Sequence, residues 1–414
     1  MRAPSGLAAF RTDLSDLFGS DARLHAFARH AAFALVPLVL AIAFGLLGTG
    51  PDPRHNWLGQ MLGYDFSQVW IAGRGALAGH PAEVYDLPRH LANQQAEFGA
   101  EAGQFAWHYP PVFLLPASLA GLLPYPAAFL AWMFFSLTLF VVAIWRATGS
   151  RDAVLIACAH PLVFCNLAYG QNGLITAGLL TLGALLVDRR PLIAGCLFGL
   201  VAYKPQLAAL APLLLLTTGR WRCLSACIVC VGAQGLGTLA LFGWSPWQGF
   251  LDTLALSNRI VLTEAWSGLD INAGAFGAAR LLGGSVATAW AVQIAVALAA
   301  VATVWRIWSG PARIDLLAAA LLAAAPLVSP YVPLYDLAPL VPASVLLALA
   351  AHRSGGLTGW ERALLVASPL CAASLRMVAA STGLSLGLAL SLATLLLVAR
   401  RALPVRAPAP VPAG

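Results

Sequence analysis

Polar chemistry is concentrated in residues 63–86, GYDFSQVWIAGRGALAGHPAEVYD, which directly follow the first long apolar segment of the chain. This stretch contains three carboxylates, those of Asp65, Glu83 and Asp86, in a sequence that is otherwise mostly apolar. A carboxylate held beside a substrate hydroxyl group can take its proton as a general base. Asp65 also precedes a predicted helix over 66–77, where the helix dipole favours an anion. The sequence therefore leaves two roles open for Asp65, a catalytic base and a helix cap.

A second candidate is Lys204, the only lysine among the 24 basic residues. It lies between two short apolar segments, and Pro205 breaks any helix at this point. A charge at membrane depth costs at least ~2.5–3.5 kcal/mol on insertion scales. Lys204 therefore needs a counter-anion, unless its side chain extends to the nearest interface. A phosphate group on a lipid would serve as that anion.

Two further motifs place polar groups between apolar segments. In YGQNG, the amides of Gln171 and Asn172 can hydrogen-bond the hydroxyl groups of a sugar, or they can join neighbouring helices. In SPYVPLYD, the candidates for contact with a substrate are Tyr331 and Asp336. The carboxylate of Asp336 either faces a cavity or caps the helix that follows.

The composition is that of a membrane protein, with 60% hydrophobic and 10% charged residues and a mean hydropathy of +0.79. Apolar runs recur from Ala31 to Ala399; they are roughly 15–20 residues long, and a helix needs about 20 residues to span a bilayer. They lack the alternation of a membrane β-barrel, so an all-α, polytopic integral membrane protein is predicted. The net charge of +7 comes from arginines near helix ends, and no basic stripe interleaved with aromatics indicates nucleic-acid binding.

Arginine pairs orient the predicted spans, because cytoplasmic loops carry an excess of basic residues. About twelve (11–13) transmembrane helices bring both termini to the cytoplasm and make residues 31–401 a single transmembrane domain. Its two large outer loops are 50–108 and 243–285. Residues 1–30 are predicted as a cytoplasmic tail that leads into a retained anchor, and the proline-rich residues 402–414 as a disordered cytoplasmic tail.

The spans 110–124 and 152–168 are the weakest, and one of them is expected to be short or re-entrant. In the first outer loop, apolar residues at three- and four-residue spacing over 66–77 predict an amphipathic helix on the membrane surface. A turn and a second short helix follow. Trp107 and Tyr109 are predicted to lie at the height of the membrane interface.

The seven cysteines lie in or at the ends of apolar segments. Cys227 and Cys230 form a CxxC pair, but no second pair or histidine accompanies them in the sequence. They are interpreted as small core residues, and no metal site is predicted.

Taken together, these motifs resemble those of GT-C glycosyltransferases, and within them those of glycosyltransferase family 87, the polyprenyl-phosphate-mannose-dependent mannosyltransferases and their relatives. The matching residues are DF and AL.G.P.EVYD in the first outer loop, YPP, YGQNG, RRPLIAG followed by YKP, and SPY..LYDL. In this order they cover about residues 31–351.

The resemblance implies a GT-C-like transferase of the cytoplasmic membrane, among membrane lipids, whose active site faces the periplasm or exterior. The donor would be a polyprenyl-phosphate-linked hexose, with mannose as the expected sugar, and the acceptor a lipid or a glycan. No cofactor is expected. Asp65 matches the first-loop aspartate that acts as general base, with inversion at the sugar. Lys204 would bind the departing phosphate, with help from Arg74 or Arg259, and Asp86 is a further substrate-binding candidate.

Two other functions fit part of the sequence. A transporter or a flippase of lipid-linked sugars would explain the many spans and a buried lysine. It predicts paired buried charges in two related halves, and no internal repeat is found in the sequence. A non-catalytic scaffold gives no reason for a lone lysine together with an acidic outer loop. A membrane hexosyltransferase is therefore the predicted function.

Overall fold

The structure, a computed structural model, describes residues 21–47, 52, 54–55, 61–99 and 105–403. Within this part of the chain every regular element is a helix, and extended structure is limited to two isolated bridges. The predicted all-α class is therefore confirmed for the residues that the structure describes.

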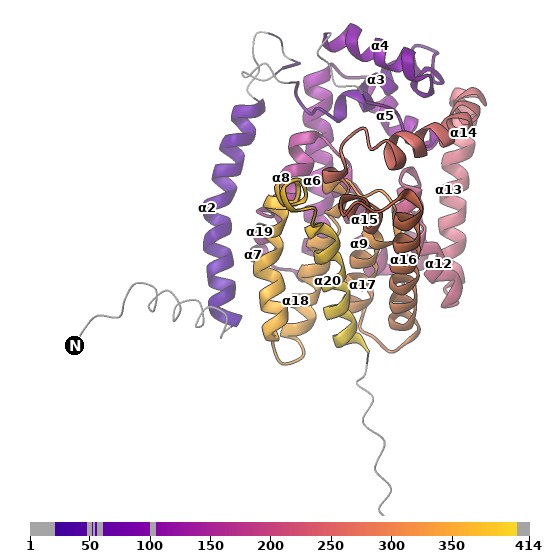
Figure 1. The fold of residues 1–414 in the computed structure, drawn as a ribbon. Coiled ribbons are helices and arrows are strands. Elements are labelled where there is room, and N and C mark those ends of the chain that lie inside the picture. Colours follow the sequence, from indigo (N-terminus) through magenta and orange to yellow (C-terminus); the bar gives the residue numbers. More distant parts are fainter. Residues whose placement is uncertain (1–20, 48–51, 53, 56–60, 100–104, 404–414) are drawn as a thin grey trace, which may run out of the picture.

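The helices form a bundle and a cap over one of its ends (Figure 1). The cap consists of α3 (Phe66–Leu77), η1 (Glu83–Tyr85), α4 (Leu87–Phe98), η2 (Pro111–Phe113), α5 (Leu114–Gly121) and α14 (Ser245–Asn258). The bundle consists of α2 (Asp21–Leu47), α6 (Tyr125–Thr148), α7 (Arg151–Cys158), α8 (Pro161–Tyr169), α9 (Gly173–Leu186), α10 (Pro191–Gly199), η3 (Leu200–Tyr203), α11 (Pro205–Ala208), α12 (Leu210–Thr217), α13 (Trp221–Phe242), α16 (Val286–Ser309), α17 (Ile314–Val328), α18 (Leu340–His352), α19 (Gly359–Thr382) and α20 (Leu386–Ala402). Shorter elements join them: η4 (Arg259–Thr263), η5 (Leu269–Ile271), α15 (Ala275–Leu281) and η6 (Leu334–Leu337).

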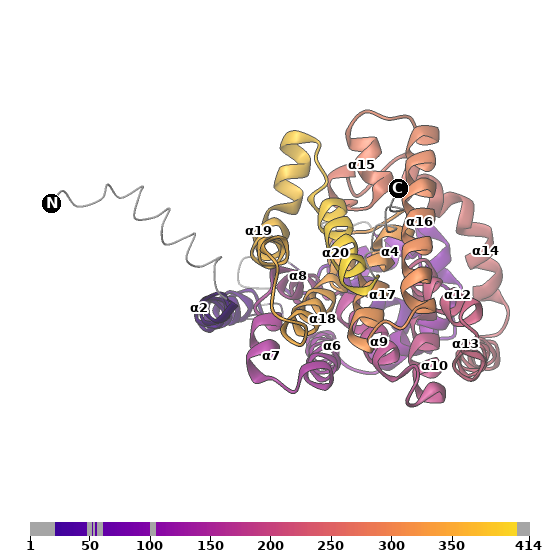
Figure 2. The same cartoon turned by 90° about the horizontal axis from the view of Figure 1, so that it is seen from below.

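Helix α17 forms the centre of the bundle. It packs against α9, α16, α18 and α20, which surround it in the view along the bundle (Figure 2). Every residue from Asp315 to Leu327 is buried, and most of them are alanine or leucine. A helix that is apolar on all sides must be covered on all sides, and small side chains let its neighbours approach closely. This helix and its neighbours therefore form the centre of a core that also takes in buried residues of the cap helices α3 and α5 and of the bundle helix α6.

The predicted count of about twelve full-length spans is not confirmed. Within the described residues, five helices are long and apolar enough to cross a membrane, or six if the bent pair α7–α8 forms one span. Five further apolar segments form helices of only 10–17 residues. Their composition suits a span, but helix breakers such as Pro205, which follows η3, divide them into shorter helices.

Both segments predicted to be weak spans differ from a straight crossing helix. Segment 110–124 contains a 3-10 turn of 3 residues and an α-helix of 8 residues. Segment 152–168 forms α7 and α8, which are bent by 59°. The bend lies at His160, whose backbone is extended because Pro161 disfavours the helical conformation of the residue before it. One of these two segments was expected to be irregular, and both are.

The first helix begins at Asp21 rather than at Ala31, where the first apolar segment starts. The Asp21 carboxylate accepts a hydrogen bond from Arg362 Nε at 2.8 Å, which ties the start of α2 to α19. Part of the predicted N-terminal tail is therefore helical. The predicted tail residues 1–20 and 404–414 lie outside the described residues.

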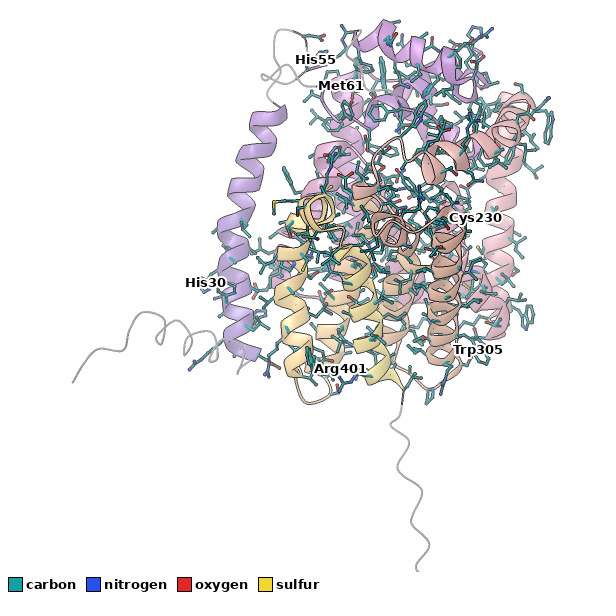
Figure 3. All side chains as sticks on the ribbon, in the orientation of Figure 1. His30, His55, Met61, Cys230, Trp305 and Arg401 are labelled. Carbon is teal, nitrogen blue, oxygen red and sulfur yellow. The ribbon has the colours of Figure 1, made fainter. Side chains whose placement is uncertain are left out.

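Buried carboxylates join the helices at the end of the bundle opposite the cap. Glu361 pairs with Arg401, and Asp315 accepts a hydrogen bond from Arg353 at 3.1 Å. Arg401 and His55, which precedes α3, lie at opposite ends of the molecule (Figure 3). The arginine-rich end is the side that the positive-inside bias predicts to be cytoplasmic.

The helix predicted over 66–77 forms, but its surroundings differ from the prediction. Most of its residues are buried against α5 rather than free on a surface. A Cβ atom on Gly73 would lie 1.9 Å from the Ala117 carbonyl oxygen, so only glycine allows this approach. Trp70 Nε1 donates to the Leu123 carbonyl at 2.9 Å. The helix is thus attached to the protein along its apolar face, and its position on a membrane surface stays a prediction.

Candidate active site

Four candidate residues lie where a helix begins or breaks. Asp65 precedes α3, Gln171 lies between α8 and α9, Lys204 lies between η3 and α11, and Asp336 lies in η6. Irregular backbone at membrane depth is tolerated only where protein covers it or where it lines a cavity. Hydrogen bonds and charge interactions join these four breaks, so they form one cluster.

The Asp65 carboxylate accepts a hydrogen bond from Gln171 Nε2 at 2.7 Å. Its backbone N–H donates to the Tyr169 carbonyl at 3.0 Å, so main chain and side chain both contact the YGQNG segment. Although Asp65 occupies the N-cap position of α3, its side chain makes no capping hydrogen bond. The capping role considered for this carboxylate is therefore wrong.

The environment of Asp65 favours proton transfer near neutral pH. The side chain is half-buried, and burial raises the pKa of its carboxyl group to about 6. The hydrogen bond from Gln171 and the charge of Lys204 oppose this shift, whereas the charge of Asp336 adds to it. A base whose pKa lies near the operating pH is suited to accept a proton during catalysis.

The glycine in front of Gln171 explains how the YGQNG segment reaches Asp65. Gly170 ends α8 with φ +72°, a left-handed conformation that L side chains rarely adopt. A Cβ atom at this position would lie 2.5 Å from the Cβ atom of Phe66. Because Phe66 follows Asp65 directly, this close approach places Gln171 beside the carboxylate.

Tyr109, predicted from the sequence only to lie at the membrane interface, belongs to the site. Its hydroxyl group donates to Gln171 Oε1 at 3.5 Å and accepts from Asn172 Nδ2 at 3.0 Å. Its ring packs on Phe113, with the ring centroids 4.3 Å apart. Its place in the YPP motif is the one sequence signal that could have identified it.

Lys204 forms a buried ion pair with Asp336, 132 residues away in the sequence. The two residues are 4% and 2% exposed, so the side chain of Lys204 does not extend to the interface. Its counter-anion lies within the protein. The ammonium group also lies 5.5 Å from the centroid of the Tyr335 ring, at cation–π distance. Both charged residues were candidates from the sequence, but nothing in it predicted that they pair.

Tyr331 lies close enough to the cluster for its charges to act on it. Burial raises the pKa of its phenol to about 12; the Asp65 and Asp336 carboxylates add to this shift, and a hydrogen bond with Ser267 opposes it. Asn172 Oδ1 is buried and has no hydrogen-bond partner among the described residues. The cluster thus combines a carboxylate, an ion pair, a phenol and an amide oxygen without a hydrogen-bond partner among the described residues.

The structure does not bring Arg74, Asp86 and Arg259 into this cluster. Arg74 is exposed and lies nine residues after Asp65, about 13 Å along α3 at 1.5 Å per residue. Asp86 caps α4 with its carboxylate. Arg259 is exposed and forms its ion pair with Glu264 at 3.2 Å.

The cysteines and histidines form no comparable centre. Within the part of the chain that the structure describes, no group of three or more His, Cys, Asp and Glu side chains could hold a metal ion. Cys227 is buried and Cys230 is partly buried in α13, and both are free thiols.

Comparison with known proteins identifies the family. A sequence profile of glycosyltransferase family 87 matches residues 107–330, more than half of the 414 residues. The chain belongs to glycosyltransferase family 87. It is therefore a membrane glycosyltransferase, as its motifs predicted. No curated protein and no solved structure matches the chain. The matched part of this family 87 member contains Gln171, Asn172 and Lys204, and the fold adds Asp65 and Asp336 from outside it.

Proposed function

We propose that this chain transfers a hexose, with mannose as the expected sugar, from a polyprenyl-phosphate donor to a lipid or glycan acceptor. The reaction would take place at the outer face of the cytoplasmic membrane, in a single GT-C-like domain over residues 31–401. The observation that carries the proposal is the Asp65 carboxylate, which Gln171 holds near the charges of Lys204 and Asp336. Membership of family 87 supports the transferase class.

Asp65 is the proposed general base. The acceptor hydroxyl oxygen attacks C1 of the hexose, and Asp65 takes the proton of that hydroxyl group. The bond between C1 and the phosphate oxygen breaks, and its electron pair leaves with the lipid phosphate. A single displacement of this kind inverts the configuration at C1. With a pKa of about 6, the carboxyl group is mostly ionised at neutral pH and is ready to accept the proton.

Lys204 is the proposed source of positive charge for the departing phosphate. Charge that develops on a leaving group is stabilised by an oppositely charged group already in place. Asp336 stabilises the ammonium group, because an isolated charge at this depth would be costly. On donor binding, Lys204 would be shared between Asp336 and the phosphate.

The remaining polar groups are proposed to bind the sugar and acceptor. Asn172 Oδ1 needs a donor, and a sugar hydroxyl group provides one. Gln171 and Tyr331 contribute an amide and a phenol close to Asp65. Arg74, Asp86 and Arg259 are left out of this proposal, because their contacts lie elsewhere.

One observation fits a transporter or flippase. That class was expected to contain paired buried charges, and Lys204 with Asp336 is such a pair. The pair is adjacent to a carboxylate whose pKa suits a base, an arrangement that transport alone does not require. Family membership also favours transfer over transport.

The test is the transfer of label from tritiated polyprenyl-phosphate mannose to lipids of bacterial membranes that contain the full-length protein. The wild type should transfer label, and Asp65→Asn should reduce the rate by about 10²–10⁴-fold, the usual effect of losing a general base. Asp86→Asn is the matched control, because Asp86 lies in the same loop and caps a helix; it should retain transfer. Wild-type turnover in a folded Asp65→Asn protein would exclude Asp65 as the base. Movement of intact donor across the membrane without transfer would favour the flippase.

A further inference from the structure

A directional chain of three hydrogen bonds ends on Asp65. Asn172 Nδ2 donates to the Tyr109 hydroxyl oxygen at 3.0 Å, and the Tyr109 hydroxyl group donates to Gln171 Oε1 at 3.5 Å. Gln171 Nε2 then donates to Asp65 Oδ2 at 2.7 Å. An amide NH₂ group only donates, and a phenol carries one hydrogen. Because Asn172 donates to the phenol oxygen, the phenol hydrogen is left for Gln171.

The orientation of the Gln171 amide decides what it presents to Asp65. With Oε1 occupied by Tyr109, the NH₂ group faces the carboxylate and stabilises its ionised form. Turned by 180°, the amide would present its oxygen to Asp65 and favour the protonated form. Gln171 is 4% exposed, so water has little access to replace the partner that fixes the amide, and the local polar interactions are strong.

We infer that Tyr109 is a positioning residue, which acts through Gln171 to keep the Asp65 carboxylate ionised and ready to accept a proton. This inference rests on the proposed role of Asp65 as general base. Gln171 supplies the one hydrogen bond recorded to the Asp65 carboxylate among the described residues. The second carboxylate oxygen is thus left for the acceptor hydroxyl group. Tyr109 itself needs no contact with the substrate for this role.

Other groups also act on Asp65 and must stay constant in a test. The charged groups are Lys204 and Asp336. The titratable neutral groups that feel its charge, besides Tyr109, are Tyr125, Cys165, Tyr169, Tyr331 and Tyr335. Phenols and thiols are ordinarily neutral near pH 6. Removal of the Tyr109 hydroxyl group leaves all of these groups in place.

The variant Tyr109→Phe isolates the hydroxyl group. The Tyr109 ring packs against Phe113 and Trp107, with ring centroids 4.3 and 5.1 Å away, and phenylalanine keeps these contacts. Tyr203→Phe is a matched control. The Tyr203 ring stacks on Phe113 at 4.9 Å. Its hydroxyl group pairs with Thr176 at 2.7 Å and donates to the Asn172 backbone carbonyl at 3.5 Å, but it does not contact the Gln171 amide.

The experiment measures the rate of label transfer from tritiated polyprenyl-phosphate mannose as a function of pH, with full-length protein in membranes. In Tyr109→Phe the acid limb of the rate profile should shift to a higher pH by about one unit, which corresponds to a tenfold change in the ionisation equilibrium of Asp65. Tyr203→Phe should leave the limb in place. Gln171→Leu should also move the limb upward, and adding Tyr109→Phe to Gln171→Leu should have no further effect, because residues that act through one another are not additive.

The outcomes separate this inference from the proposed function. If Asp65→Asn keeps wild-type turnover, the base is elsewhere and both proposals fail. If Asp65→Asn is inactive while the acid limb of Tyr109→Phe stays at the wild-type pH, only the positioning role of Tyr109 is overturned. A shift in Tyr109→Phe that simply adds to that of Gln171→Leu would likewise overturn it. Should Tyr109→Phe not fold, an acid limb that stays at the wild-type pH in Gln171→Leu would overturn the inference, because Tyr109 acts through this amide.

Discussion

Removal of the Lys204 ammonium group should destabilise the protein strongly. In Lys204→Met, the Asp336 carboxylate would stay buried, at 2% exposure, without its hydrogen-bond donor. Breaking a buried ion pair by removing one partner costs about 3–5 kcal/mol in the free energy of unfolding. Asp336→Leu should cost a similar amount, because it leaves the ammonium group unpaired. The double variant removes both charges at once, and its stability should be close to that of the wild type.

The buried cysteines of the protein allow a direct assay. Cys223 and Cys227 are buried free thiols, so a thiol-reactive fluorophore should label them only when the purified protein unfolds on heating. Both single variants should lower the unfolding midpoint, and the double variant should recover most of the loss. Arg259→Met is the control, because its pair with Glu264 is exposed and such pairs contribute roughly 0–1 kcal/mol. An unchanged midpoint in Lys204→Met, or additive losses in the double variant, would refute the buried pair.

The same double variant separates stability from donor binding. If Lys204 also contacts the donor phosphate, the double variant should be stable but should bind donor about ten- to a hundred-fold more weakly. This range corresponds to a charged hydrogen bond of about 1.5–3 kcal/mol at about 1.4 kcal/mol per decade. The single variant Lys204→Arg should bind donor more tightly than the double variant but more weakly than the wild type, because a planar guanidinium group does not replace a compact ammonium group. A donor titration that coincides with that of the wild type would remove Lys204 from the phosphate site.

Three further predictions concern the base, the YGQNG turn and the topology. The pKa of Asp65 is raised to about 6, and the ionised carboxylate is the active form. The transfer rate should therefore be maximal above pH 6 and fall about tenfold for each pH unit below it. A rate that is constant down to about pH 4 would contradict this. Gly170→Ala should abolish transfer, since the added Cβ atom would lie 2.5 Å from the Cβ atom of Phe66. The control Gly149→Ala has a similar positive φ but open space around it, so it should retain transfer although the left-handed backbone costs about 1–2 kcal/mol of stability. Equal activities of the two variants would show that the turn at Gly170 tolerates a side chain. Reporter fusions within 90–100 and 250–270 should report the outer side, and fusions after Arg222 and Arg313 the cytoplasm; a cytoplasmic signal within 90–100 would place the proposed base on the wrong side of the membrane.

Local features of the sequence determined the class of the protein and the place of many helices. The segment predicted over 314–328 forms α17 at Ile314–Val328, and that predicted over 286–305 forms most of α16. Apolar run length and helix breakers act between neighbouring residues, so both can be read without the fold. Lys204 was selected because charge is costly at membrane depth, and Asp65 because it begins a polar stretch of the first outer loop and matches a family motif. The sequence alone also suggested the family, through motifs whose order along the chain could be read directly.

Only the tertiary structure decided which of these residues act together. Asp65 and Gln171 are 106 residues apart, and Lys204 and Asp336 are 132 residues apart. Each stands at a helix break, and the packing of the helices determines which breaks meet. Tyr109 is uncharged, so charge could not identify it in the sequence, and its inferred role depends on hydrogen bonds with two amides of another segment. The helix on which Asp65 depends was predicted from its periodicity, but its burial against α5 was not, because the same apolar face could have been covered by lipid or by protein.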